Sequence, residues 1–412
     1  MLYREVPKNG DKLSILGFGA MRLPKKDGAI DQEKATALLR HAIDNGINYI
    51  DTAWTYQKEQ SENFLGNALA DGYREKVRIA TKMPHWLIRD RQDMDKILQF
   101  QLNKLHTDYI DYYLIHSLTK GGWEKMKENG VLEFLDRAKN DGRIKNTGFS
   151  FHDNVELFKE IIDSYDWDIC LIQYNYLDEH NQAGTEGLRY AAEKGIAVMV
   201  MEPLRGGNLA RNTTPEISDI WNKADVKRTP AEWALRWVWN HPEVTVVLSG
   251  MNDISQVDEN IRTASEAYPN SLNQKELDTV ARVAEKYRDL MTIPCTGCNY
   301  CMPCPAGVDI PGCFELYNSR EVFRGAGNDD TQYRYLLYQM GILGNRSSAS
   351  LCINCGKCKE QCPQHIDIPV KMKEVETQFE SPVIKLKATA MRHILPFFRQ
   401  FSLFKNRQRN KN

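Results

Sequence analysis

The chain places a carboxylate, an amine and an imidazole at the ends of three successive apolar runs, as Asp51, Lys82 and His116. These runs are rich in β-branched and aromatic residues, which predicts strands, and helix-like segments separate them. The carboxyl ends of successive parallel strands meet at one edge of a sheet, where barrel enzymes keep their active sites. Tyr56 follows Asp51 by five residues and can reach the same edge from its loop.

These four side chains have complementary roles in proton chemistry. A tyrosine phenol has a pKa of about 10 and is a poor acid at neutral pH. An adjacent Lys82 ammonium lowers that pKa, and Asp51 beside the ammonium keeps it charged. Tyr56 is therefore a candidate general acid, and His116 can orient a carbonyl oxygen by a hydrogen bond. Single polar residues at strand ends are common, but four with matched chemistry favour an active site.

Strand and helix patterns alternate along the first two thirds of the chain. The predicted strands lie at 16–23, 47–53, 77–83, 109–116, 146–149, 169–175, 196–201 and 244–248. Each precedes a helix; one is expected over 124–139, and another, opened by Thr229 and Pro230, follows a polar loop after the seventh strand. Eight such pairs in roughly 265 residues predict an α/β fold, a (β/α)8 TIM barrel. The rival, an open doubly wound sheet, lacks its dinucleotide fingerprint.

Nine of the ten cysteines crowd between residues 295 and 362. Crowded cysteines in a reducing compartment favour metal binding over disulfides. The expected organisation is a barrel at 1–270, a linking helix at 271–291, a C-terminal α-helical, ferredoxin-like iron–sulfur domain at 292–375 and a basic amphipathic tail at 376–412.

Two cysteine runs, each closed by proline, form the expected cluster-binding elements. The second run has the Cys-x2-Cys-x2-Cys-x3-Cys-Pro spacing of bacterial ferredoxins, which bind [4Fe–4S] clusters, and the first is one residue shorter. The eight candidate ligands are Cys295, Cys298, Cys301, Cys304, Cys352, Cys355, Cys358 and Cys362. In two-cluster proteins the fourth cysteine of a run serves the other cluster. Exchange would place Cys362 with the first run and Cys304 with the second.

Other uses of these cysteines remain open. A pair of four-cysteine zinc sites is the alternative, because zinc also accepts Cys-x2-Cys pairs. The shorter first run leaves one or two clusters as options. Cys313 is either a substitute ligand or, as we favour, a buried thiol, and Cys170 lies in a predicted core strand.

Charge and hydropathy exclude several classes of protein. A net charge of −1 gives no reason to expect nucleic acid. The sequence has no apolar signal core and no run long enough to be a transmembrane segment, so a cytoplasmic protein is expected. Residues 381–412 carry eight Lys or Arg and no Asp or Glu. This tail either touches an anionic surface or an acidic redox partner, or packs on the barrel as a helix, which we favour.

The strand-end motifs resemble the aldo-keto reductase family. Asp51-Thr52-Ala53-x-x-Tyr56, Ala80-Thr81-Lys82 and Leu114-Ile115-His116 match its catalytic tetrad in order and in strand context. The resemblance covers roughly residues 10–265 and implies NAD(P)H-dependent reduction of an aldehyde or ketone, with Tyr56 as proton donor. It also implies that Trp54 lines the substrate pocket.

The resemblance implies a set of cofactor-binding residues on the later strand ends and loops. They are Ser150, Gln173, Pro203, Leu204, Gly206, Gly207, Ser249, Gly250, Met251, Gln256, Glu259 and Asn260. The chain departs from the family pattern at Phe151, which replaces an Asn, and at Met201, which replaces a stacking Tyr. Gly250 and Gln256 stand where NADPH-specific members often carry cations, which a 2′-phosphate prefers, so the choice between NADH and NADPH stays open.

Three hypotheses on function follow. The first, which we favour, is an NAD(P)H-dependent carbonyl reductase or alcohol dehydrogenase that acts on a small substrate, with [4Fe–4S] clusters that are structural or exchange electrons with a ferredoxin-like partner. The second is an iron–sulfur electron-transfer protein whose clusters feed a barrel-bound substrate or flavin without nicotinamide. The third, a redox sensor on an inactive barrel, disagrees with the intact tetrad. Nicotinamide delivers two electrons and each cluster one, so a single mechanism does not follow, and the departures at Met201, Phe151 and Gln256 keep the second hypothesis open.

Overall fold

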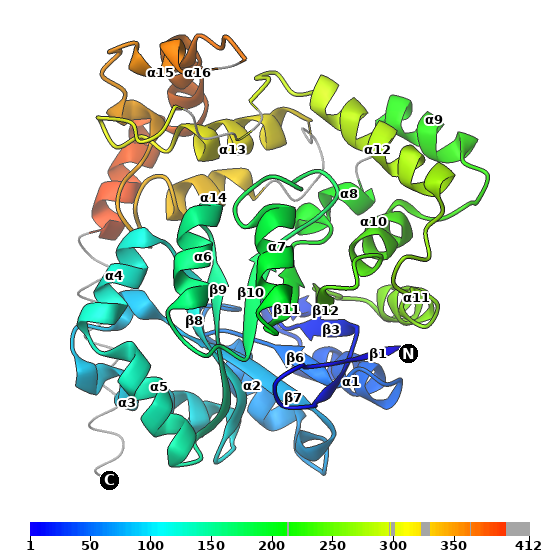
Figure 1. Cartoon of the computed structure of the whole chain (residues 1–412). Helices are drawn as coiled ribbons and strands as arrows, with labels where there is room; N and C mark the ends of the chain where they lie inside the picture. Colours follow the sequence, from blue (N-terminus) through cyan, green and yellow to red (C-terminus); the bar gives the residue numbers. More distant parts are fainter. Residues whose placement is uncertain (212–213, 296, 298–300, 323–329, 363, 393–412) are drawn as a thin grey trace. The chain divides into compact units, whose positions relative to one another are not determined.

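A computed structural model describes residues 1–412 except 212–213, 296, 298–300, 323–329, 363 and 393–412 (Figure 1). It divides into two compact units, Met1–Ala284 and Glu285–Asn412. In the first unit, eight parallel strands close into a barrel. These strands are β3 (Leu16–Gly19), β6 (Tyr49–Asp51), β7 (Arg78–Met83), β8 (Ile110–Leu118), β9 (Ile144–Phe151), β10 (Ile169–Gln173), β11 (Ala197–Met201) and β12 (Val244–Ser249).

Helices connect successive strands of the barrel, which confirms the (β/α)8 prediction. They are α1 (Gln32–Asp44), α2 (Ser61–Ala68), α3 (Arg91–Leu105), α4 (Lys120–Glu128), α5 (Val131–Asn140), α6 (Val155–Asp163), α7 (Gly184–Glu193), α8 (Asn208–Arg211), α9 (Pro215–Lys223), α10 (Pro230–Trp239) and α11 (Ile254–Ala264). Short 3-10 turns lie at η1 (Arg74–Lys76), η2 (His85–Leu87) and η3 (Arg205–Gly207). Thr229 caps α10, as predicted, because its hydroxyl accepts the amide of Glu232.

Two local predictions were wrong. The single helix expected over 124–139 is split into α4 and α5, because Gly130 adopts a left-handed φ of 68° that breaks the helical hydrogen-bond ladder. The polar loop expected after the seventh strand contains α8 and α9. Helix α9 forms because Ile217 and Trp221, four residues apart, bury one face.

The barrel interior is packed by alternate residues of its strands and is closed at one end by a hairpin. Strands β1 (Tyr3–Glu5) and β2 (Lys12–Ser14) pair antiparallel across the Asn9–Gly10 turn. Val6 and Leu13 of this hairpin join a buried cluster of inward-facing residues that includes Tyr49 of β6 and Leu171 of β10. A second short hairpin pairs β4 (Lys25–Lys26) with β5 (Ala29–Ile30).

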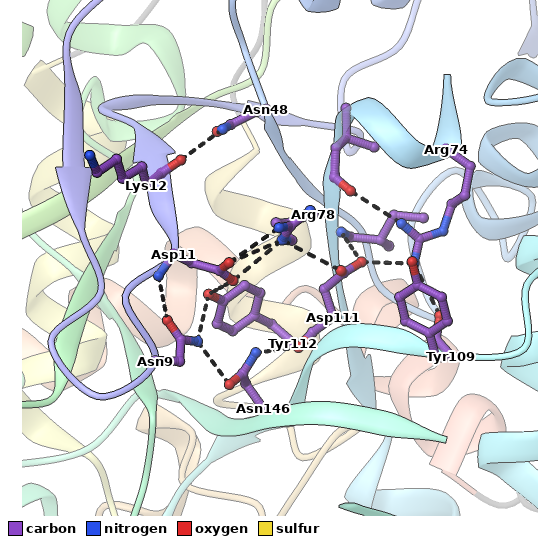
Figure 2. A network of polar contacts seen from close by, with 12 residues as sticks. Asn9, Asp11, Lys12, Asn48, Arg74, Arg78, Tyr109, Asp111, Tyr112 and Asn146 are labelled. Atoms are coloured by element: carbon purple, nitrogen blue, oxygen red, sulfur yellow. Dashed lines mark hydrogen bonds and ion pairs between the residues drawn. The ribbon is translucent and has the colours of Figure 1, made fainter. Parts of the chain in front are cut away.

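A polar network lies below this interior, at the amino-terminal ends of β7 and β8 (Figure 2). Tyr112 donates from Oη to Asp11 Oδ2 at 2.7 Å and accepts from the Asn9 amide at 3.1 Å. Arg74 Nη2 lies 2.8 Å from Asp111 Oδ2, which also accepts the amide of residue 79. These contacts tie the hairpin and two strands together at the end opposite the tetrad.

The second unit is helical and has its own core. Its elements are α12 (Gln274–Asp289), which spans the division between units, α13 (Ile310–Val322), α14 (Thr331–Leu337), η4 (Ala349–Leu351), α15 (Lys357–Glu360) and α16 (Ile368–Phe379). Phe314, Tyr335 and Phe379 are fully buried in this core. Within the predicted basic tail, residues 382–392 form a helix, and its Ala388 is buried in this core and not, as favoured from the sequence, against the barrel; residues 393–412 of the tail lie outside the described residues. Of the helices described, none has the length and apolar character needed to cross a bilayer.

Candidate active site

Lys82 lies at the centre of the site and contacts three other residues. Its Nζ lies 2.8 and 2.6 Å from the two carboxylate oxygens of Asp51, donates to the Thr52 carbonyl at 2.8 Å and to Tyr56 Oη at 3.2 Å. Lys82 and Asp51 are 1% and 2% exposed. The structure therefore brings three of the four predicted tetrad residues into direct contact.

Strand register explains why these side chains meet. Strands β6, β7 and β8 are parallel neighbours, and Asp51 pairs with Ala80 while Lys82 pairs with Leu114. Side chains alternate between the two faces of a strand, so Asp51 and Lys82 point to the barrel interior while Thr81 points to the surrounding helices. His116 is two residues beyond Leu114 on β8 and shares the interior face.

Burial and charge shift the pKa values of Lys82 and Asp51 in opposite directions. Burial lowers the pKa of Lys82, and Asp51 opposes that shift. Burial likewise raises the pKa of Asp51, and the Lys82 ammonium opposes it. The contact distances are those of a charge-assisted pair, so we assign an ammonium and a carboxylate to the two residues.

His116 is a neutral imidazole. Burial, and then the charge of Lys82, hold its pKa well below the ordinary value. Its ring centroid lies 6.2 Å from that of Tyr56, and its buried Nδ1 has no hydrogen-bond partner within the described part of the chain. A neutral histidine beside a phenol can hold a carbonyl oxygen without competing for the proton.

Two aromatic residues near the site differ in placement. Trp54, predicted to line the substrate pocket, is 4% exposed and packs with its ring 5.1 Å from Phe100. Its pocket role stays a prediction. Trp86 of η2 was missed by the sequence reasoning, yet its ring lies 5.2 Å from His116. Its position four residues after Lys82, just beyond the strand end, was the available signal.

The loop between Tyr56 and α2 is strained. Gln57, Lys58 and Glu59 have φ angles of 52°, 54° and 68°, in the left-handed region. Such a conformation costs about 1–2 kcal/mol for a residue with a Cβ atom. Hydrogen bonds hold it at both ends: Gln57 donates to the Met21 carbonyl at 2.8 Å, and Lys104 donates to the Glu59 carbonyl at 3.1 Å.

The residues predicted to hold a nicotinamide carboxamide are already engaged by the protein. Ser150 Oγ accepts the Ser117 amide at 2.7 Å, which leaves its hydroxyl proton to donate. The Gln173 side chain donates to Asp178 at 3.2 Å and accepts from Gln182 at 3.0 Å. Ser150 therefore fits a carboxamide, whereas Gln173 must exchange a partner to do so.

The predicted phosphate-side loop has an unusual backbone. Arg205, Gly206 and Gly207 have φ angles of 49°, 70° and 99°. Within this loop the backbone N–H of Arg205 donates to the Glu202 carbonyl at 3.0 Å and that of Gly207 to the Leu204 carbonyl at 2.9 Å, so both are already engaged. Arg205 is 3% exposed, with Nε 3.1 Å from Asp178 Oδ2. The neighbouring Pro203 and Leu204 are buried and half-buried, and the phosphate-binding role of this loop stays a prediction.

The predicted adenosine side combines buried and exposed residues. Ser249 Oγ accepts the Asn260 amide at 3.1 Å in a buried contact, and Met251 is also buried. Gln256 accepts the amide of residue 252 and Glu259 accepts the hydroxyl of residue 229. A Cβ on Gly250 would lie 3.1 Å from Arg22 Cδ. The aliphatic part of the Arg22 side chain thus packs against this loop.

In the second unit, a cavity gathers four cysteines from both runs. It is lined by Cys304, Cys352, Cys355 and Cys358, with apolar residues around them. This is the second of the two predicted ligand sets. No group of three His, Cys, Asp or Glu side chains converges on a single-ion position within the described residues. Four thiols from two separate runs around one cavity are the ligand set that a [4Fe–4S] cluster requires.

The second unit also contains cysteines that do not line this cavity. Cys295, Cys301 and Cys362 are half-buried against the core of the second unit, and Cys298 lies outside the described residues. Cys313 is fully buried, and its Sγ lies 3.9 Å from Tyr335 Oη. That placement agrees with a buried thiol.

Comparisons with known proteins divide the chain in the same way as its contacts. Residues 15–285 match the aldo/keto reductase family, and residues 294–366 match a 4Fe-4S dicluster domain. L-galactose dehydrogenase of Arabidopsis thaliana is 25% identical over 310 residues, which cover 70% of this chain and 95% of that protein. The NADH-specific methylglyoxal reductase of Escherichia coli is 25% identical over 299 residues, covering 60% and 89%.

Solved structures give the same result for the barrel. An aldo-keto reductase from Bacillus halodurans in its holo form superposes with a TM-score of 0.59 at 26% identity. The match covers 69% of this chain and 96% of that one.

Proposed function

Because the chain belongs to the aldo/keto reductase family and is an oxidoreductase of that type, we propose that it reduces a small aldehyde or ketone, or oxidises the corresponding alcohol, with a nicotinamide dinucleotide. The observation that carries the proposal is the buried contact between Asp51, Lys82 and Tyr56, with a neutral His116 beside it. Bound nicotinamide would supply the hydride that the carbonyl carbon accepts.

The protein's own residues move the proton. Tyr56 gives its phenolic proton to the carbonyl oxygen, and the Lys82 ammonium at 3.2 Å stabilises the phenolate that remains. Asp51 holds that ammonium in place through two contacts. His116 donates a hydrogen bond that fixes the carbonyl oxygen near the phenol. The products are an alcohol and a phenolate, which solvent reprotonates.

The cofactor would lie along the carboxyl-terminal ends of the later strands. Ser150 and Gln173 would hold the carboxamide; the phosphate-side and adenosine-side residues are Pro203, Leu204, Gly206, Gly207, Ser249, Gly250, Met251, Gln256, Glu259 and Asn260. The Escherichia coli relative is named NADH-specific, whereas in this chain the stem of Arg22 packs against Gly250, so its guanidinium is the cation that a 2′-phosphate would use here. Titration with both dinucleotides distinguishes the two cases.

We propose that the dicluster domain holds two [4Fe–4S] clusters with exchanged fourth ligands. Cys304, Cys352, Cys355 and Cys358 would bind one, as their shared cavity supports, and Cys295, Cys298, Cys301 and Cys362 the other. The clusters transfer single electrons and would exchange them with a ferredoxin-like partner or stabilise the domain. Cys358→Ala should lose about half of the iron in anaerobically purified protein. Zinc in place of iron would contradict the assignment.

A second candidate function is cluster-fed reduction without nicotinamide. It is favoured by the Gln173 amide, which the protein itself engages at both ends, and by the replacement residues Phe151 and Met201. In that case Tyr56 would still be the proton donor, and electrons would arrive one at a time.

An anaerobic titration separates the two candidates. The holoprotein is titrated with NADH and with NADPH while cofactor fluorescence and iron–sulfur absorbance are recorded. Saturable binding of either dinucleotide, followed by turnover of a carbonyl substrate, supports the reductase. Absence of binding, with clusters that dithionite still reduces, would reject nicotinamide chemistry and leave the second candidate.

A further inference from the structure

A second buried carboxylate lies behind the strand end that carries Lys82. Glu62, in the first turn of α2, is 1% exposed. Its Oε1 accepts from Thr81 Oγ1 at 2.7 Å and from Gln101 Nε2 at 2.5 Å. Its Oε2 lies 3.6 Å from Lys104 Nζ. Thr81 faces the helices while Lys82 faces the barrel interior, so Glu62 and Asp51 lie on opposite sides of β7.

The contacts indicate that Glu62 is ionised. An amide N–H and a hydroxyl both donate to the same oxygen, and an ammonium faces the other, which is the pattern of a carboxylate. Burial raises the pKa of Glu62, and Lys104 opposes that shift most strongly. Lys104 is fixed in turn by its stacking over Trp54 at 4.6 Å.

Gln101 connects this carboxylate to the backbone of Lys82. Its Nε2 donates to the Lys82 carbonyl at 3.1 Å as well as to Glu62, and its Oε1 accepts from Tyr113 at 2.8 Å. Gln101 is fully buried, so each of its amide contacts replaces lost hydration. The backbone position of Lys82 therefore depends on the Glu62 carboxylate through one intervening side chain.

We propose that Glu62 is a positioning residue of the site, which fixes the strand end carrying Lys82 and adds the negative charge that keeps the Lys82–Tyr56 pair protonated. The inference rests on the proposed function for its role in turnover. The charged and titratable groups that interact with Glu62 are Lys104 on α3 and Tyr113 on β8, together with Lys82 across β7 and Asp51 beyond it.

The direction of the expected pH shift follows from the negative charge that the substitution of Glu62 removes. Removing a nearby negative charge makes proton loss from the Lys82–Tyr56 pair easier, so Glu62→Gln should move the basic limb of the kcat–pH profile to lower pH. A shift on the order of one pH unit is expected for charges in a partly desolvated site. KM should change little, because Glu62 is buried behind β7. Glu62→Asp keeps the charge, so its basic limb should lie close to the pH of the wild-type limb.

Asp111→Asn is the matched control. It makes the same chemical change in a buried, paired carboxylate at the opposite end of the barrel. We expect it to leave the basic limb in place. An unchanged limb in Glu62→Gln, or an equal shift in Asp111→Asn, would overturn the proposal.

A readout without turnover completes the test. The Tyr56 phenol is titrated in the holoprotein by NMR of ¹³C-labelled tyrosine, with its signal identified by its loss in Tyr56→Phe. The midpoint should fall in Glu62→Gln and rise in Lys104→Gln, which removes a positive charge; Lys104→Gln keeps the test available if Glu62→Gln does not fold. Midpoints that do not move overturn the inference. If they move while the wild-type protein reduces no carbonyl compound, the proposed function fails and the control of Tyr56 by Glu62 stands.

Discussion

The two ends of the barrel carry similar buried ion pairs in different surroundings. Lys82 pairs with Asp51 at the carboxyl-terminal end, with side chains 1% and 3% exposed. Arg74 pairs with Asp111 at the amino-terminal end, with side chains 13% and 6% exposed (Figure 2). A buried ion pair therefore does not by itself mark an active site, because it also serves to join strands.

The two ends differ in the charged groups that lie next to their tyrosine. At the amino-terminal end, Tyr112 donates to the Asp11 carboxylate, and burial together with that carboxylate raises its pKa. At the other end, Tyr56 Oη accepts from the Lys82 ammonium, and the phenol also contacts the Asp51 carboxylate, so a cation is present there as well as an anion. A cation stabilises a phenolate and an anion disfavours it. The same side chain is thus a structural donor at one end and a candidate acid at the other.

The largest expected effect comes from removing one hydroxyl at each end. Tyr56→Phe should lower kcat about 10²–10⁴-fold, the usual contribution of a positioned general acid, with unchanged iron content and melting temperature. Tyr112→Phe should keep kcat and cost about 1 kcal/mol of unfolding free energy, because a buried hydrogen bond is lost. Steady-state kinetics and urea unfolding measure both. Unchanged turnover in Tyr56→Phe would contradict the assignment of Tyr56 as the general acid and with it the difference between the two ends.

Breaking the amino-terminal pair should affect stability without affecting catalysis. Asp111→Asn leaves Arg74 buried with its charge uncompensated, which costs roughly 3–5 kcal/mol of unfolding free energy. At temperatures where the variant stays folded, kcat and KM should equal those of the wild type. A loss of kcat comparable to that in Tyr56→Phe would show that the two ends are coupled.

The carboxyl-terminal end should also make stability depend on pH. His85, beside Trp86, is 6% exposed, and burial lowers its pKa to about 4. In the unfolded chain this histidine binds a proton near pH 6.5. The contribution of His85 to the unfolding free energy is therefore fully present above that pH and falls by about 3 kcal/mol as the pH drops toward 4. His85→Gln should flatten the slope in urea unfolding.

The smallest expected effect concerns the strained loop after Tyr56. Lys58 has a φ of 54°, which glycine adopts without the Cβ penalty. Lys58→Gly should therefore raise the unfolding free energy by about 0.5–1 kcal/mol, less the entropy that glycine gains in the unfolded chain. Ala at the same position is the control and should not stabilise. A gain with Ala as large as that with Gly would reject left-handed strain as the cause.

The sequence predicted the barrel and the convergence of Asp51, Lys82 and Tyr56, because apolar runs ending in polar residues determine both the strands and their edge. It did not predict the break at Gly130, since glycine inside a helical pattern is often tolerated. It also missed Glu62, because an acid in the first turn of a helix usually faces solvent and complements the dipole. Its burial depends on how α2 packs against α3, which is a tertiary effect.

The engagement of Gln173 was equally invisible to sequence reasoning. A glutamine at the end of β10 matches a family position, yet its hydrogen-bond partners, Asp178 and Gln182, come from the following loop. Loop conformation decides whether an amide faces a ligand or the protein, and periodicity carries no information on it.

The exposure of Cys355 has a consequence for how long the protein survives in air. Three of the four cysteines around the cavity in the second unit are half-buried, but Cys355 is exposed. In the proposed ligand set, the iron atom bound to Cys355 would be the one that dioxygen and peroxide reach first. Damage should therefore begin at that corner, with loss of a single iron and oxidation of one thiol, before the rest of the cube is lost.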